Sequence, residues 1–147
     1  MDQNVVTFAT TIEVRDHCLC LATQRAARAL ARRFDEALRP IGLTSGQFSL
    51  LMSLNRPEPP ALGSVAALLA MDRTTLTANL KPLERKGLLA ISQAKADRRI
   101  RLLSLTDAGR AVLKEALPVW VATHASIDQE LDAFDGEAIR KALRVMA

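Results

Sequence analysis

Tyrosine is missing from the sequence, and only 3% of the residues are aromatic. Cysteine is nearly as scarce, with 2 residues, too few for a disulfide framework. Alanine and leucine are abundant instead, with 24 and 23 residues among 147. An all-β protein needs more β-branched and aromatic residues, so this composition predicts one mainly helical domain.

Long apolar runs are also missing. The longest, Val65 to Met71, has seven residues, whereas a membrane-spanning helix needs about 20. The first residues, Met1-Asp2-Gln3-Asn4, have no basic group of the kind that opens a secretory signal. We therefore expect a cytoplasmic protein that makes no contact with a membrane.

The net charge of +4 is concentrated in the middle of the chain. Residues 72–101 contain eight basic and three acidic side chains. Eight minus three gives this segment a net charge of +5, which exceeds the +4 of the whole chain, while the flanking segments are close to neutral. Such a concentration is typical of a polyanion-binding element in a neutral scaffold.

The spacing of apolar residues predicts the helices. It is three to four from about Ile12 to Leu38, which indicates a long amphipathic helix that ends at Pro40-Ile41-Gly42. Thr44 and Gln47 form a capping-box pattern that opens a second helix. Three prolines between residues 56 and 60 predict a loop.

Two short helices with a tight turn between them come next. One is expected over residues 61–71, and the other runs from Arg73 to Lys86 with Asp72 as N-cap and Gly87 as terminator. Pro82 is expected to kink or shorten the second helix, because it lacks the N–H that would bond Ala78. This pattern predicts a helix-turn-helix.

A hairpin and two further helices complete the chain. Leu88 to Ser92 and Ile100 to Leu105 are β-capable runs joined by a polar connection. Thr106-Asp107 caps a long helix, and Asp135 caps a last one over residues 136–146. The fold class is therefore mainly α with a small β-hairpin, a winged helix-turn-helix between N- and C-terminal helices.

The second helix of a helix-turn-helix presents its first residues to base edges in the major groove of DNA. Arg73 has the fork of donors that guanine accepts, and threonine or alanine methyl groups contact thymine. Further along, Lys81 and Arg85 suit phosphates. The candidate DNA-binding residues on this helix are Arg73, Thr74, Thr75, Thr77, Ala78, Lys81 and Arg85.

The hairpin tip offers a second contact with DNA. Arg98 and Arg99 suit a narrow minor groove, where the negative potential is strongest. Asp97 precedes Arg99 by two residues, and we expect it to orient that side chain.

These segments resemble the multiple-antibiotic-resistance regulator (MarR) family of winged helix-turn-helix transcription factors. The most specific part is Asp97-Arg98-Arg99 running into Leu103-Ser104-Leu105-Thr106-Asp107-Ala108-Gly109, and Met71 to Thr77 and Leu83 to Leu88 are similar to the recognition helix and its exit. The resemblance covers residues 12–147. It implies a homodimer on a pseudo-palindrome, a ligand- or stress-responsive repressor, and a small aromatic or phenolic effector.

The resemblance also implies a division of the chain. Residues 1–11 would be a tail, 12–43 and 106–147 dimerisation helices, and 44–105 the DNA-binding lobe. Dimerisation follows physically as well, because the terminal helices have more apolar positions than a small domain covers alone. These positions are Leu113, Leu117, Trp120, Val121, Ile139, Leu143 and Val145.

The thiols lie in the segment His17-Cys18-Leu19-Cys20. This spacing does not bring its side chains together on one metal ion, so no metal or other cofactor is expected. The family's oxidant-sensing branch keeps a reactive cysteine near the first helix, which implies Cys18 or Cys20 as an alternative redox sensor. Without tyrosine neighbours, and with the nearest helix N-terminus near Ile12, buried inert thiols are the favoured interpretation.

An enzyme is disfavoured, because the sequence has no phosphate-binding glycine loop, catalytic triad or paired carboxylates in a plausible cleft. The competing function is a winged-helix adaptor that binds proteins without DNA. A salt-dependent affinity for duplex DNA distinguishes the two.

Overall fold

The computed structural model of the chain describes residues 5–147. Residues 1–4, which bear on the secretory-signal expectation, lie outside them. In chain order the elements are α1 (Phe8–His17), α2 (Leu19–Leu38), the 3-10 helix η1 (Arg39–Ile41), α3 (Ser45–Ser53), α4 (Leu62–Leu68), α5 (Arg73–Arg85), β1 (Leu89–Gln93), β2 (Arg101–Leu105), α6 (Asp107–Glu130) and α7 (Gly136–Met146). The fold class expected from the sequence is confirmed.

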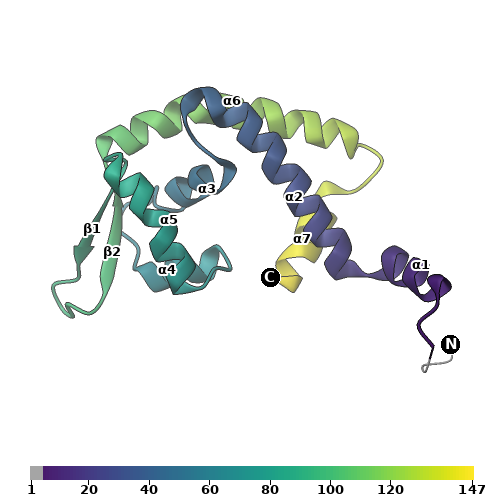
Figure 1. The fold of residues 1–147 in the computed structure, drawn as a ribbon. Coiled ribbons are helices and arrows are strands. Elements are labelled where there is room, and N and C mark those ends of the chain that lie inside the picture. Colours follow the sequence, from purple (N-terminus) through teal and green to yellow (C-terminus); the bar gives the residue numbers. More distant parts are fainter. Residues whose placement is uncertain (1–4) are drawn as a thin grey trace.

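The helices form an arch (Figure 1). Helices α2 and α6 contact each other along its top, and α3, α4, α5 and the hairpin make a lobe at one end. At the other end lie α1 and α7, neither of which has a buried residue. Within residues 5–147, no helix is long and apolar enough to span a membrane.

Leucine fills the core of the lobe. The largest side chains with almost no exposed surface come from α2, α3, α4, α5 and β2, and they are Leu38, Leu50, Leu51, Val65, Leu76, Leu80, Leu83 and Leu103. One continuous cluster therefore joins the helix-turn-helix, the hairpin and the top of the arch. Burial of this kind contributes about 1.5–3 kcal/mol per side chain, so the lobe has a complete core within one chain.

The helix-turn-helix forms where the sequence predicts it, with one shorter helix. Helix α4 ends at Leu68 rather than residue 71, because the chain turns through Ala70, whose φ is 49°. Asp72 caps α5 as predicted, and Gly87 follows its end with a φ of 71°. Pro82 does not shorten α5, since Leu80 and Leu83 are fully buried on either side and anchor the helix.

The hairpin pairs Leu89 with Leu105 and Gln93 with Arg101. Both strands begin one residue later than predicted. Before β1, the Leu88 N–H donates to the Leu83 carbonyl oxygen of α5, and its own carbonyl oxygen accepts from the Thr106 N–H. Before β2, the Ile100 N–H donates to the Asp97 carbonyl oxygen in the turn. Strand β2 also contacts the segment before α4. The N–H of Leu103 donates to the carbonyl oxygen of Pro60 at 3.0 Å, and Leu102 bridges Ala61. The wing is thus attached directly to the helix-turn-helix.

The prediction of one N-terminal helix starting at Ile12 is wrong. A capping box between Thr7 and Thr10 starts α1 at Phe8, so residues 8–11 are helical rather than tail. Cys18 then separates α1 from α2 with an extended backbone, at φ −77° and ψ 104°. The apolar spacing continues across this break, so the pattern of residues does not reveal it.

The C-terminal helices begin as predicted, at the caps Thr106 and Asp135. Leu113 is not among the positions that await a partner, because it is 6% exposed and belongs to the chain's own core. Leu117, Val121, Leu143 and Val145 are exposed. Trp120 and Ile139 are half-buried.

Gly109 is a site where the fold allows no side chain. It lies in the first turn of α6, and a Cβ atom there would be 2.0 Å from the carbonyl oxygen of Leu88. At Gly46, in the first turn of α3, the nearest atom to such a Cβ is 4.0 Å away.

We expect Gly109→Ala to lower the free energy of unfolding by about 1–3 kcal/mol, the usual cost of overpacking, because the Leu88 backbone would have to move. Gly46→Ala is the matched control and should leave stability unchanged or slightly raised. Urea unfolding of both variants measures the difference. An unchanged midpoint for Gly109→Ala would contradict the close packing of α6 on the lobe.

Candidate nucleic-acid interface

The first turns of α5 are open to solvent. Asp72 holds them in place, because its Oδ1 accepts a hydrogen bond from the N–H of Thr75 at 2.8 Å. The Thr75 hydroxyl donates to the other carboxylate oxygen at 2.7 Å. The bonds from the Thr75 N–H and hydroxyl lower the pKa of Asp72. Thr77 is half-buried and donates its hydroxyl to the carbonyl oxygen of Arg73 at 2.7 Å.

A hollow of about 330 Å³, here called the helix groove, runs along this surface. It brings together five of the residues predicted on α5, plus one from the wing that the sequence analysis missed. Its lining is Arg73, Thr74, Thr77, Ala78, Lys81 and Arg101. Thr75 and Arg85, the other two candidates, do not line it.

Arg101 is the residue that sequence reasoning missed. It is the first residue of β2 and lacks the motif that draws attention to Arg98 and Arg99. Alternation along the strand was the available signal, because residues two apart share a face of a strand. Leu103 and Leu105 are buried, so Arg101 continues the same face beyond the core.

A second hollow of about 400 Å³, here called the wing groove, separates α4 from the hairpin. Three arginines line it, Arg73, Arg99 and Arg101, together with Ile100 and residues 61–64. Arg73 and Arg101 border both grooves. No carboxylate of residues 5–147 lines either groove, which makes this surface attractive to an anion.

At the hairpin, Asp97 binds Arg99 as the sequence predicts. The Arg99 guanidinium donates to both carboxylate oxygens, at 3.1 Å and 3.0 Å, and the Arg99 N–H donates at 3.0 Å. These bonds lower the pKa of Asp97 and raise that of Arg99. The Arg99 side chain remains 91% exposed, so it is positioned but accessible. Arg98 is exposed and lines neither groove.

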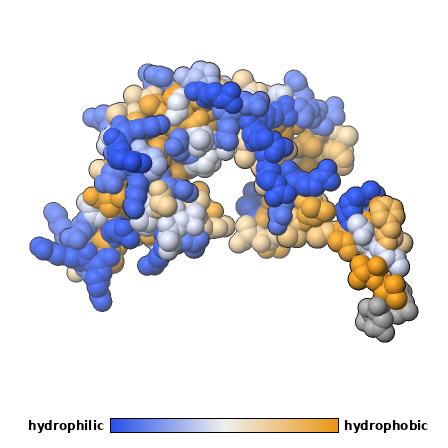
Figure 2. Space-filling model, viewed as in Figure 1, coloured by the Kyte–Doolittle hydropathy of each residue, from blue (hydrophilic) through white to orange (hydrophobic). Residues whose placement is uncertain are grey.

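The polar surface of the hairpin and the apolar surface of the terminal helices lie at opposite ends of the molecule (Figure 2). Hydrophilic side chains cover the hairpin, whereas apolar side chains gather on α7 and α1 at the far end of the arch (Figure 2).

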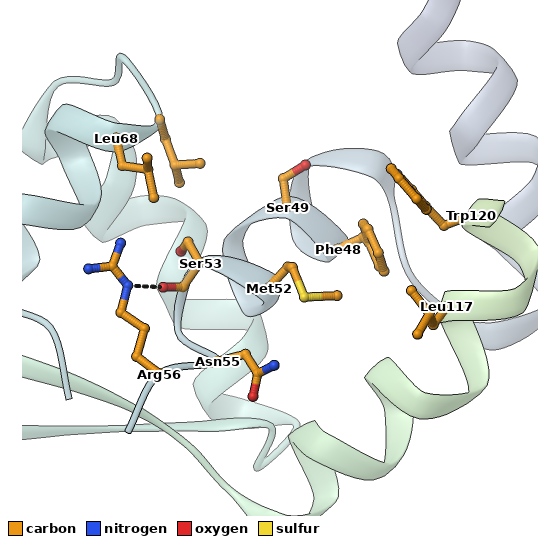
Figure 3. A pocket seen from close by; sticks show the side chains of 10 residues that line it. Phe48, Ser49, Met52, Ser53, Asn55, Arg56, Leu68, Leu117 and Trp120 are labelled. Atoms are coloured by element: carbon orange, nitrogen blue, oxygen red, sulfur yellow. Dashed lines mark hydrogen bonds between the residues drawn. The ribbon is translucent and has the colours of Figure 1, made fainter. Parts of the chain in front are cut away.

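An apolar cleft of about 600 Å³ lies between α3, the end of α4 and α6 (Figure 3). Phe48 and Trp120 are stacked at one side of it, with ring centroids 6.4 Å apart. On the other side Arg56 donates to the carbonyl oxygen of Ser53 at 3.2 Å. The rest of the lining is Ser49, Met52, Asn55, Leu68, Leu69 and Leu117.

The thiols are not buried, contrary to expectation. Cys18 is half-buried and Cys20 is exposed, because the helix breaks at Cys18 and the chain does not cover this face. Cys18 is itself the N-cap of α2, and its Sγ accepts the N–H of Leu21 at 3.4 Å. The helix N-terminus is therefore at Cys18 and not a turn or more away. Cys20 Sγ accepts from the Gln24 amide at 3.2 Å.

Lobe, wing and arch together define a winged helix-turn-helix protein, and comparisons with known proteins agree. The family model described as MarR family matches residues 43–100. The solved Mycobacterium tuberculosis transcriptional regulator MosR in complex with DNA is 35% identical, with a TM-score of 0.80, over 88% of this chain and 93% of that one. Bordetella bronchiseptica BpsR, whose DNA binding is regulated by 6-hydroxynicotinic acid, is 30% identical with a TM-score of 0.74, over 85% of this chain and 95% of that one.

Among curated proteins, the organic hydroperoxide resistance transcriptional regulator of Bacillus subtilis is 31% identical over 66% of this chain and 65% of its own length. The matches span about half to two thirds of the curated relatives. The chain belongs to the MarR family.

The Asp97 and Arg99 pair yields a direct test. Because the Arg99 side chain is the largest cause of the lowered Asp97 pKa, Arg99→Ala should raise that pKa toward the ordinary range for aspartate, while the backbone N–H at position 99 still lowers it. An NMR titration of the side-chain carboxyl carbon measures it, with Arg98→Ala as control because Arg98 has no bond to Asp97 among residues 5–147. An Asp97 pKa that is the same in Arg99→Ala and the parent would contradict the pairing.

Proposed function

We propose that the protein is a transcriptional regulator that binds double-stranded DNA sequence-specifically as a homodimer. The observation that carries this proposal is the pair of basic grooves shared by α5 and the wing, whose lining among residues 5–147 includes no carboxylate. A regulator of this kind acts where the chromosome lies, so we place it in the cytoplasm.

Helix α5 would enter the major groove. The exposed side chains of Thr74 and Ala78 would contact base edges, and Thr77 lines the same helix groove. Thr75 serves through the capping bond that fixes the first turn. Lys81 and Arg85 would contact phosphates, while Arg98 and the positioned Arg99 would reach the flanking minor groove.

The second copy of the chain would cover the apolar end of the arch. Phe8 in α1 is 78% exposed, and Val145 in α7 is 81% exposed. Neither helix has a buried residue in the single chain. A symmetric partner buries such faces without adding a different protein, and it presents two α5 helices to one duplex.

The apolar cleft is the candidate effector site. Its size and its stacked Phe48 and Trp120 suit a small aromatic molecule. Arg56, at the rim, adds a donor for a carboxylate or phenolate. Because the cleft lies between the lobe and α6, an occupant would shift the recognition helices relative to the arch.

The salt dependence of the affinity for duplex DNA distinguishes the proposed regulator from a protein-binding adaptor. For the parent, the binding constant for a random duplex should fall steeply with salt, with a log–log slope of about −0.9 for each phosphate contacted. Lys81→Ala should weaken all duplexes alike and flatten that slope by about one per half-site. Fluorescence anisotropy measures this, and Lys114→Ala, exposed on α6 and outside both grooves, is the control. A parent that binds no duplex at low salt would support the adaptor.

A second candidate function, thiol-based sensing, is favoured by the position of Cys18. Backbone N–H groups at a helix N-terminus stabilise an anion, and here one donates to Cys18 Sγ. A thiolate there would attack the distal oxygen of an organic hydroperoxide. The sulfur becomes a sulfenic acid, and the peroxide is reduced to the alcohol as it takes up a proton. Because Cys18 joins α1 to α2, its oxidation would alter this junction and thereby disturb the dimer.

Under this candidate, cumene hydroperoxide should weaken DNA binding of the parent by about 5- to 150-fold, the usual range of coupling between sites. Cys18→Ser should be resistant, because serine keeps the cap but is not oxidised. Cys20→Ser is the matched control and should respond like the parent. Fluorescence anisotropy before and after treatment measures the DNA affinity. If the affinity of the parent is unchanged, both thiols are inert and this candidate is wrong.

A further inference from the structure

We propose that Arg73 and Arg101 together hold one phosphate of the DNA backbone, and that Gly63 makes room for the Arg73 guanidinium. This inference rests on the proposed function. It replaces the guanine contact suggested by the sequence for Arg73, and it adds Arg101 to the interface.

Arg101 is brought to this place by the attachment of the wing. Its neighbour Leu102 bridges Ala61, directly ahead of α4, and Leu103 is bound to Pro60. The buried Leu103 fixes which face of β2 looks toward the helices. Arg101 shares that face one step beyond the core, which is why it borders the same two grooves as Arg73.

The guanidinium of Arg73 packs against Gly63 of α4. A Cβ atom built on Gly63 would lie 2.9 Å from Nη2 of Arg73 and 3.5 Å from its Cζ. The guanidinium therefore lies against the backbone of the preceding helix, toward the wing. It lies at the boundary between the helix groove and the wing groove, both of which Arg73 lines.

The surroundings of Arg73 and Arg101 favour the binding of an anion between them. Among residues 5–147 neither Arg73 nor Arg101 forms a salt bridge, whereas Arg99 in the same groove is bound by Asp97. Two guanidinium groups that border the same hollows repel each other unless a negative group lies between them. Phosphate oxygens match the planar fork of each guanidinium.

The position of Arg73 and Arg101 between helix and wing indicates that the anion is a phosphate of the DNA backbone. With α5 in the major groove and the hairpin in the adjacent minor groove, the sugar-phosphate strand that separates those grooves passes between helix and wing. Arg73 and Arg101 lie at that boundary, because they border both the helix groove and the wing groove. A phosphate contact there fixes register without reading sequence.

The test compares parent, Arg73→Ala, Arg101→Ala and the double variant by anisotropy, on a selected duplex and a random one, from low to high salt. Each single variant should lose at least about tenfold in affinity, as expected for a charge-assisted bond, and equally on both duplexes. If one phosphate is shared, the double variant should flatten the log–log slope by about 0.9 per half-site, or about 1.8 per dimer, rather than twice that. Arg28→Ala, exposed on α2 and outside both grooves, should match the parent.

Gly63→Ala provides an independent arm. The added methyl group displaces only the end of a flexible side chain, so the fold is retained. Affinity should fall in the parent background. In the Arg73→Ala background Gly63→Ala should have no further effect, because the group that it displaces is gone.

The outcomes separate this inference from the function on which it rests. A parent without affinity for duplex DNA refutes the proposed function. A parent that binds, with Arg101→Ala equal to it or with Arg73→Ala losing affinity for only certain base pairs, overturns the shared phosphate and leaves the function intact. A double variant whose slope changes by about 3.6 per dimer would mean two separate phosphates and would also overturn it.

Discussion

The attachment of β2 to the segment before α4 is the contact on which the candidate interface depends. It consists of the 3.0 Å hydrogen bond from the Leu103 N–H to the Pro60 carbonyl oxygen, the bridge between Leu102 and Ala61, and the fully buried Leu103 side chain. A free hairpin would be marginally stable in water. Bound in this way, the wing keeps a fixed position relative to α5, so residues 28 positions apart, Arg73 and Arg101, border the same hollows.

The two ends of the molecule are stabilised differently. The lobe is closed by its own leucines and is tied to α6 by Thr106, whose hydroxyl donates to the Gly87 carbonyl oxygen at 2.6 Å. Helices α2 and α6 are joined further along by Arg33, which binds Glu130 and, at 2.7 Å, Ser126. Beyond this link α1 and α7 bury nothing within the chain. The core of the winged helix-turn-helix lobe is thus complete in one chain, whereas the faces of α1 and α7 stay uncovered.

Much of this could be predicted from local chemistry. The caps Thr44, Asp72, Thr106 and Asp135 mark helix starts at the predicted places because each satisfies backbone N–H groups of the next few residues. The break at Cys18 could not be predicted, since a single extended residue leaves the apolar spacing almost unchanged. The burial of Leu113 and the place of Arg101 were missed for another reason, because both depend on contacts between elements far apart in sequence.

Under the proposed function, two chains present two α5 helices to one duplex. Hydroxyl-radical footprinting on a selected duplex, with the mass of the complex measured in parallel, tests it most directly. We expect two chains per duplex and two protected half-sites about 10 bp apart, on one face of the DNA. One chain per duplex with a single protected patch would contradict it.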